Sequence, residues 1–167
     1  GAKILAQTVY SAITGDYGGL QMPITYTNGM VLQRDRPLLI KGKANAHSKI
    51  KVKIAGHKKT TETDSQGCWQ VTLAPLAAGG PHTLSITDGK TSLLYKDVLA
   101  GEVWLCSGQS NMEFMLKATT TAAEDVPAAT DDQLRLFEMK GRWLTYAVEW
   151  PVSVLDSLNH LQYYKHA

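Results

Sequence analysis

The chain has 167 residues, of which 44% are apolar and 19% are charged, and its formal net charge is +2. The composition is that of an ordinary globular protein. The small net charge and the lack of a basic run interleaved with aromatic residues argue against a nucleic-acid partner. No run of about 18 apolar residues occurs, so no membrane span is predicted.

Residues 1–22 are small and polar, with scattered apolar side chains and glycines at Gly15, Gly18 and Gly19. This texture predicts a poorly ordered lead-in.

Residues 23–99 carry short β-type runs, separated by turn signals at intervals of about eight to twelve residues, a spacing typical of β-sandwiches. Ile50, Val52 and Ile54 alternate with lysines, which predicts a half-buried strand with a wet lysine face. Asp88-Gly89 is a strong hairpin signal. We therefore expect an antiparallel β-sandwich domain. Its predicted strands are residues 30–33, 38–43, 50–55, 58–64, 69–73, 83–87 and 92–98.

The pattern changes near residue 100. Residues 103–106 are apolar without alternation, which predicts a strand buried on both faces. A weak helix over 118–129, stopped by Pro127, and a strand over 134–139 follow. Strand, helix and strand form the opening of a parallel α/β layer. Since two strands cannot complete such a sheet, we expect residues 100–167 to form an α/β domain that is incomplete in this chain.

Ser110 lies where the predicted buried strand turns into a helix, with Gly108 two residues before it to permit a tight turn. Such a turn can expose a nucleophilic hydroxyl among free backbone N–H groups. Met112 departs from the G-x-S-x-G pattern. On the pattern alone a helix N-cap is the favoured role for this serine, and a nucleophile is the alternative.

A serine nucleophile needs a base. His47, His57 and His82 fall in turns or strand ends of the β-domain, where we expect them to be solvated. His160 is the one histidine of the α/β part with a nearby carboxylate, Asp156, but its spacing matches no base motif. No metal-ligand spacing occurs, and no cofactor is predicted. The two cysteines, Cys68 and Cys106, are expected to be small core residues rather than a disulfide bridge, a metal ligand or a nucleophile.

The segment from Gly101 to Met112 (Gly-Glu-Val-Trp-Leu-Cys-Ser-Gly-Gln-Ser-Asn-Met) resembles the first sequence block of the sialate O-acetylesterase family, within the SGNH (GDSL-type) hydrolase superfamily. Three earlier stretches and one later stretch resemble further segments of that family, and the resemblance covers roughly 23–140. They are Asn28-Gly29-Met30-Val31-Leu32-Gln33-Arg34, Asp64-Ser65-Gln66-Gly67-Cys68-Trp69, Lys96-Asp97-Val98-Leu99 and Leu134-Arg135-Leu136-Phe137.

The resemblance implies a carbohydrate O-acetylesterase that acts without a metal or organic cofactor on an acetylated glycan, in an extracytoplasmic compartment. Ser110 would be the nucleophile, its own N–H an oxyanion-hole donor, and Gly108, Gln109 and Asn111 the support of the turn. The family's later blocks, which supply the other oxyanion donors and an Asp-x-x-His pair, are not visible here. We therefore expect a lead-in at 1–22, a β-sandwich accessory domain at 23–99 and an unfinished SGNH-type three-layer domain at 100–167, inactive alone.

Two alternatives remain open. The β-sandwich could be a non-catalytic carbohydrate-binding or interaction module, although only Tyr95 and Trp69 could offer an exposed ring and Trp69 alternates like a core residue. The chain could also be one subunit of a two-chain esterase whose second polypeptide supplies the base. The sequence does not specify which acetylated sugar is bound.

Overall fold

The structure, a computed structural model, describes residues 2–108, 112, 114–138 and 162–164. The chain divides into two compact units, Gly1–Glu102 and Val103–Ala167, and each is described by itself. Among the described residues, no helix is long and apolar enough to cross a membrane.

The first unit begins with a helix, α1 (Ala2–Thr14), in the segment where the sequence predicts a poorly ordered lead-in. The segment contains no glycine or proline, and Ala, Leu, Lys and Gln favour helix. Thr8 and Thr14 bond back to the carbonyls four residues earlier. The glycines that suggested disorder, Gly15, Gly18 and Gly19, all follow the helix and have positive φ. They therefore end the helix rather than prevent it.

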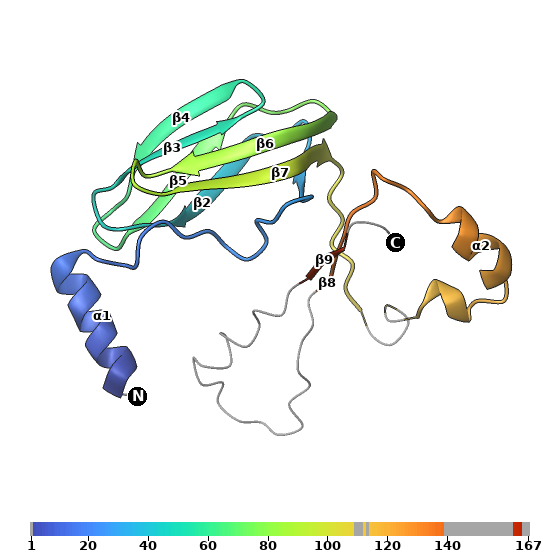
Figure 1. Cartoon of the computed structure of the whole chain (residues 1–167), viewed down its shortest axis with the longest axis horizontal. Helices are drawn as coiled ribbons and strands as arrows, with labels where there is room; N and C mark the ends of the chain where they lie inside the picture. The colour runs from blue at the N-terminus through green and yellow to red at the C-terminus, as the bar shows by residue number, and fades with distance from the viewer. Residues whose placement is uncertain (1, 109–111, 113, 139–161, 165–167) are drawn as a thin grey trace. The chain divides into compact units, whose positions relative to one another are not determined.

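Seven strands follow, in the positions predicted from the alternating runs (Figure 1). They are β1 (Val31–Gln33), β2 (Leu38–Lys43), β3 (Lys49–Ile54), β4 (His57–Glu62), β5 (Cys68–Leu73), β6 (Gly79–Thr87) and β7 (Ser92–Gly101). The turns predicted at residues 55–57 and 87–90 are present, whereas the turn predicted at 78–81 is wrong for residues 79–81, which lie within β6. Ala55 and Gly56 both have positive φ, as a tight hairpin between β3 and β4 requires, and the Asp88 carboxylate accepts from the N–H groups of Lys90 and Thr91 between β6 and β7.

The strands form a five-stranded sheet in the order β1-β7-β6-β3-β4 and a two-stranded sheet, β2-β5. The prediction of purely antiparallel pairing is wrong at one place, because β1 pairs with β7 in parallel, with Val31 opposite Leu99. These two strands come from opposite ends of the unit and are not joined by a turn. Their relative direction therefore follows from the path of the chain between them and not from a local hairpin signal.

The core is built from alternate residues of both sheets. In β3, Ile50, Val52 and Ile54 are at most 2% exposed, while the intervening lysines are exposed, as predicted. In β5, Trp69, Val71 and Leu73 are buried in the same alternation. Each such aliphatic side chain contributes about 1.5–3 kcal/mol on burial, so these two strands alone account for a large part of the unit's hydrophobic stabilisation.

The described part of the second unit contains a short 3-10 helix η2 (Leu116–Ala118), the helix α2 (Ala122–Ala128) and the strands β8 (Leu136–Glu138) and β9 (Gln162–Tyr164). The predicted helix and second strand are present in shortened form, and Pro127 lies one residue before the end of α2. The pair β8-β9 is antiparallel. The parallel pairing expected for an α/β layer is therefore not found among the described residues of this unit.

Candidate functional site

Three of the four residues predicted at the candidate site, Gln109, Ser110 and Asn111, lie outside the described residues, as does His160. The structure therefore describes the candidate site from its flanks. On the N-terminal flank it describes the chain up to Gly108, and on the other side it describes Met112 and residues 114–138.

The segment before Ser110 differs from the prediction of a buried strand. Residues 103–108 have no regular secondary structure, and Val103, Trp104 and Leu105 are 53%, 82% and 95% exposed. An apolar run forms a buried strand only where neighbouring strands pair with it and other elements cover its faces. The described residues of the second unit provide neither for this segment.

Gly108 lies in tight contact with Met112 across the three undescribed positions. A Cβ atom placed on residue 108 would lie 2.6 Å from Met112 Cγ, so a larger residue there would require the Met112 side chain to move. The role of Gly108 in the turn stays a prediction.

The start of the motif, Gly101-Glu102, is held by β1. Gln33 lies opposite Gly101 in the parallel pairing, and the Arg34 N–H donates to the Gly101 carbonyl at 3.0 Å. The Glu102 carboxylate accepts from Arg34 Nε at 2.9 Å and from Gln33 Nε2 at 3.1 Å. We call these three side chains the Glu102 clamp. Both side-chain hydrogen bonds, and the charge of Arg34, hold the pKa of Glu102 below its usual value.

A bulge in β7 brings a second pair of family-like segments together. His82 pairs with Val98 but Leu84 pairs with Tyr95, so β7 carries an extra residue between these two rungs. Asp97, within the bulge, has a φ of 57°. The Asn28 side chain accepts from the Lys96 N–H at 2.8 Å, and the Gly29 N–H donates to the Lys96 carbonyl at 2.9 Å. The Asn28–Arg34 and Lys96–Leu99 motifs thus form one structure along β1 and β7.

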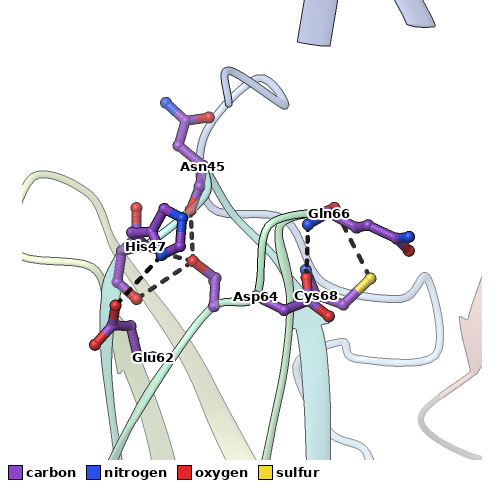
Figure 2. A network of polar contacts seen from close by, with 8 residues as sticks. Asn45, His47, Glu62, Asp64, Gln66 and Cys68 are labelled. Atoms are coloured by element: carbon purple, nitrogen blue, oxygen red, sulfur yellow. Dashed lines mark hydrogen bonds and ion pairs between the residues drawn. The ribbon is translucent and has the colours of Figure 1, made fainter. Parts of the chain in front are cut away.

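The Asp64–Trp69 motif forms the turn between β4 and β5 (Figure 2). Asp64 Oδ1 accepts from the N–H groups of Gln66 and Cys68 at 2.9 and 2.8 Å. Gly67 has a φ of 73°, and a Cβ there would lie 2.2 Å from the Ala44 carbonyl oxygen. Trp69 is 4% exposed and therefore belongs to the core. The aspartate, the glycine and the tryptophan of this motif consequently serve the fold of the β-domain.

The histidines among the described residues are His47, His57 and His82, and all three belong to the first unit. His47 Nδ1 lies 3.6 Å from Glu62 Oε1, and both side chains are largely exposed within the first unit. His57 and His82 lie on β4 and β6 and are half-buried. Within the described residues, no group of three or more His, Cys, Asp or Glu side chains could hold a metal ion.

The expectation for the cysteines is wrong in part. Both are unbridged, but Cys68 is only half-buried and Cys106 is exposed. Cys68 begins β5 on the outward-facing side of its alternation, and Cys106 lies in the irregular segment before Ser110. Neither position offers the packed surroundings that a core cysteine needs.

Neither ring considered for sugar stacking is fully exposed. Tyr95 is half-buried beside Tyr26, with the ring centroids 6.1 Å apart, and burial raises the pKa of both phenols. Trp69 is in the core. These two residues therefore do not form an open aromatic platform.

The first unit also contains an open hollow of about 970 Å³, which the sequence did not suggest. Its lining comes from three cross-strand rungs of β2 and β5, the segment 21–23, His47, and residues 61–64 at and after the end of β4. The three rungs are Lys41 with Gln70, Gly42 with Trp69, and Lys43 with Cys68. The sequence analysis predicted the two strands but not that two neighbouring segments would flank their outward-facing side chains.

The comparisons with known proteins support the resemblance found in the motifs. No family model matches the chain. The sialate O-acetylesterase of Mus musculus is 32% identical over 87 residues, and that of Rattus norvegicus is 35% identical over 99 residues. These alignments cover 49% and 55% of this chain but only 16% and 17% of the relatives.

A solved structure agrees with these relatives. The crystal structure of a carbohydrate acetylesterase from Xanthomonas citri matches 75% of this chain with a TM-score of 0.71 and 37% sequence identity, and the match covers 29% of that protein. The predicted resemblance to sialate O-acetylesterases is thus confirmed for a part of those proteins, and the chain spans less than a third of the length of these three relatives.

Proposed function

We propose that the chain is the part of a carbohydrate O-acetylesterase that carries the serine nucleophile. One observation carries this proposal: the chain resembles acetylesterases in its sequence motifs, in its overall sequence and in its fold. The first unit would be a β-sandwich accessory domain, and residues 100–167 would begin an SGNH-type α/β domain.

In the proposed reaction, Ser110 Oγ forms a bond to the acetyl carbonyl carbon while a histidine removes its proton. The oxyanion that develops is stabilised by backbone N–H groups, including that of Ser110. The carbon–oxygen bond to the sugar then breaks, and the leaving oxygen takes the proton from the histidine. Water, activated by the same histidine, hydrolyses the acetyl-serine to acetate and restores the free hydroxyl.

The acid–base histidine and the chain segments that cover residues 103–106 would lie outside these 167 residues, on the same polypeptide or on a second one. The large exposed apolar side chains support this part of the proposal, because Trp104 and Leu105 expose surface of the kind that marks an interface. The 167-residue chain alone is then expected to release no acetate from acetylated glycans. Turnover by the purified chain that disappears in Ser110→Ala would contradict the claim that the base lies elsewhere.

A chimera tests the nucleophile itself. Residues 1–167 would replace the matching part of the Xanthomonas citri enzyme, and acetate release would be compared between the chimera and its Ser110→Ala variant. Loss of the nucleophile should lower kcat by about 10⁴-fold or more. Ser107→Ala, the same chemical change three residues earlier in the motif, is the matched control and should retain activity. An active chimera that tolerates Ser110→Ala would refute the assignment.

A further inference from the structure

The hollow over β2 and β5 is bounded by two fixed walls. On one side, Gln21 and Lys43 exchange two backbone hydrogen bonds of 2.8 and 2.9 Å, which fixes segment 21–23 along the edge of β2. On the other side, the Thr63 hydroxyl donates to the Asn45 carbonyl at 2.6 Å and accepts from the Ser48 N–H at 2.7 Å (Figure 2). A hollow with such walls is formed before a ligand arrives, so little ordering opposes binding.

The β2–β5 part of the lining is cationic and unpaired. Lys41 and Lys43 are two residues apart on β2 and therefore share its exposed face, and Gln70 lies directly opposite Lys41. Within the part of the chain that the structure describes, none of these three side chains has a hydrogen-bond or ion-pair partner. Two ammonium groups and an amide on one face can donate together to a carboxylate.

The wall opposite segment 21–23 supplies acceptors. Glu62 and Asp64 line it together with His47, whose Nδ1 lies 3.6 Å from Glu62 Oε1 and leaves Glu62 Oε2 available. The Asp64 hydrogen bonds given above use Oδ1 and leave Oδ2 available. Carboxylate oxygens accept from hydroxyl groups, but they repel a ligand that is anionic throughout. The hollow thus presents donors on one side and acceptors on the other, within a volume at the upper end of the range for small-molecule sites.

We propose that this hollow binds a sugar unit that carries a carboxylate beside several hydroxyl groups, with Lys41 and Lys43 on the carboxylate and Glu62 and Asp64 on the hydroxyls. All residues of this site belong to the first unit, which would hold the glycan, and none of them belongs to the Ser110 motif. The choice of a sugar among carboxylates rests on the proposed function, whereas the anion preference rests on the lining alone.

The test is titration of the 167-residue chain with sialyllactose, and with lactose as the neutral probe, by calorimetry at low ionic strength. Sialyllactose should bind more tightly than lactose, and added salt should weaken it. The double variant Lys41→Gln/Lys43→Gln should lose about ten- to a hundredfold in affinity, since hydrogen bonds to charged groups are removed.

The matched control is Lys51→Gln/Lys53→Gln, an equivalent pair on the exposed face of β3, which should bind as the unaltered chain does. No binding of sialyllactose, equal binding of lactose, or an equal loss in both double variants at an unchanged melting temperature would overturn the proposal. Binding of glutamate, a carboxylate without sugar hydroxyl groups, with the same affinity as sialyllactose would also overturn it, because the site would then select an anion without selecting a sugar. Sialyllactose carries no acetyl ester, so Ser110→Ala should bind it normally, and failure of the esterase proposal is distinguishable from failure of this one.

Discussion

Glu102, at the end of the first unit, is connected to the residues at the end of β1 by two side-chain hydrogen bonds. Its carboxylate accepts hydrogen bonds from Gln33 and Arg34, and Glu102 directly precedes the apolar segment that leads to Ser110. A carboxylate with a pKa lower in the folded than in the unfolded state stabilises the folded state above the unfolded-state pKa. That contribution is lost as the pH falls through the folded-state pKa.

The Glu102 clamp should therefore show a defined pH dependence. Glu102→Gln should lower the urea midpoint at neutral pH, and the difference from the unaltered chain should shrink as the pH falls through the depressed pKa of Glu102. The effect should be small because the pair is exposed to solvent. Urea unfolding of both proteins across the acid range is the measurement, and a double-mutant cycle with Arg34→Gln isolates the pair. A difference that persists unchanged in strong acid would contradict this account.

At the candidate site, the sequence indicated which segments belong to the motifs but not which of these segments contact one another. The motifs around Arg34, Lys96 and Glu102 were recognised as separate stretches, and nothing local in them indicates that they pair. Their contact depends on a parallel pairing between segments far apart in the chain, which no periodicity encodes. The roles of Gln109, Ser110 and Asn111 remain predictions, because these positions lie outside the described residues.

At the scale of elements, β-alternation proved a reliable guide and continuous apolarity did not. The run Lys49–Ile54 specifies its own two faces, so its strand could be predicted from six residues. The run at 103–106 has no alternation of polar and apolar residues that would define two faces, so it becomes a strand only where other elements cover it. Helix α1 was missed because the glycines after it were given more weight than the helix formers within it.

Two turn glycines, Gly56 and Gly67, allow the cost of a steric clash to be compared with the cost of a left-handed backbone alone. Gly56 and Gly67 both have left-handed φ values, of 78° and 73°, but a Cβ at Gly56 would meet nothing within 4 Å. At Gly67 it would meet the Ala44 carbonyl oxygen at 2.2 Å. Gly56→Ala should cost about 1–2 kcal/mol from backbone strain alone. Gly67→Ala should cost clearly more, because backbone must also move, and thermal unfolding of the two variants measures the difference. Equal losses of stability in the two variants would mean that the backbone around residue 67 moves aside without a measurable cost.

At the scale of the whole molecule, the chain contains two units of different character. The described buried residues all lie in the first unit, whereas the described large apolar residues of the second unit include many that are exposed. A protease can bind and cleave exposed irregular backbone directly, whereas a packed strand must unfold locally before it can be cleaved.

Limited digestion with chymotrypsin should therefore cut after Trp104 or Leu105 well before it cuts after Trp69. The exposed fractions of the two tryptophans, 82% and 4%, provide an internal comparison of the same side chain. Mass spectrometry of the early fragments should find a stable species that ends at residue 104 or 105. Early fragments that end at Trp69 would show that the first unit is less firmly packed than described.

The parallel pairing of β1 with β7 has a consequence for how the protein is made. As the chain leaves the ribosome, β3, β4 and β6 can pair with near neighbours, but Val31 must wait for Leu99 and Arg34 must wait for Glu102. The first strand of the unit is thus among the last to be paired. Until then β1 has no partner strand in the nascent chain, and its backbone N–H and C=O groups stay open to pairing with another chain.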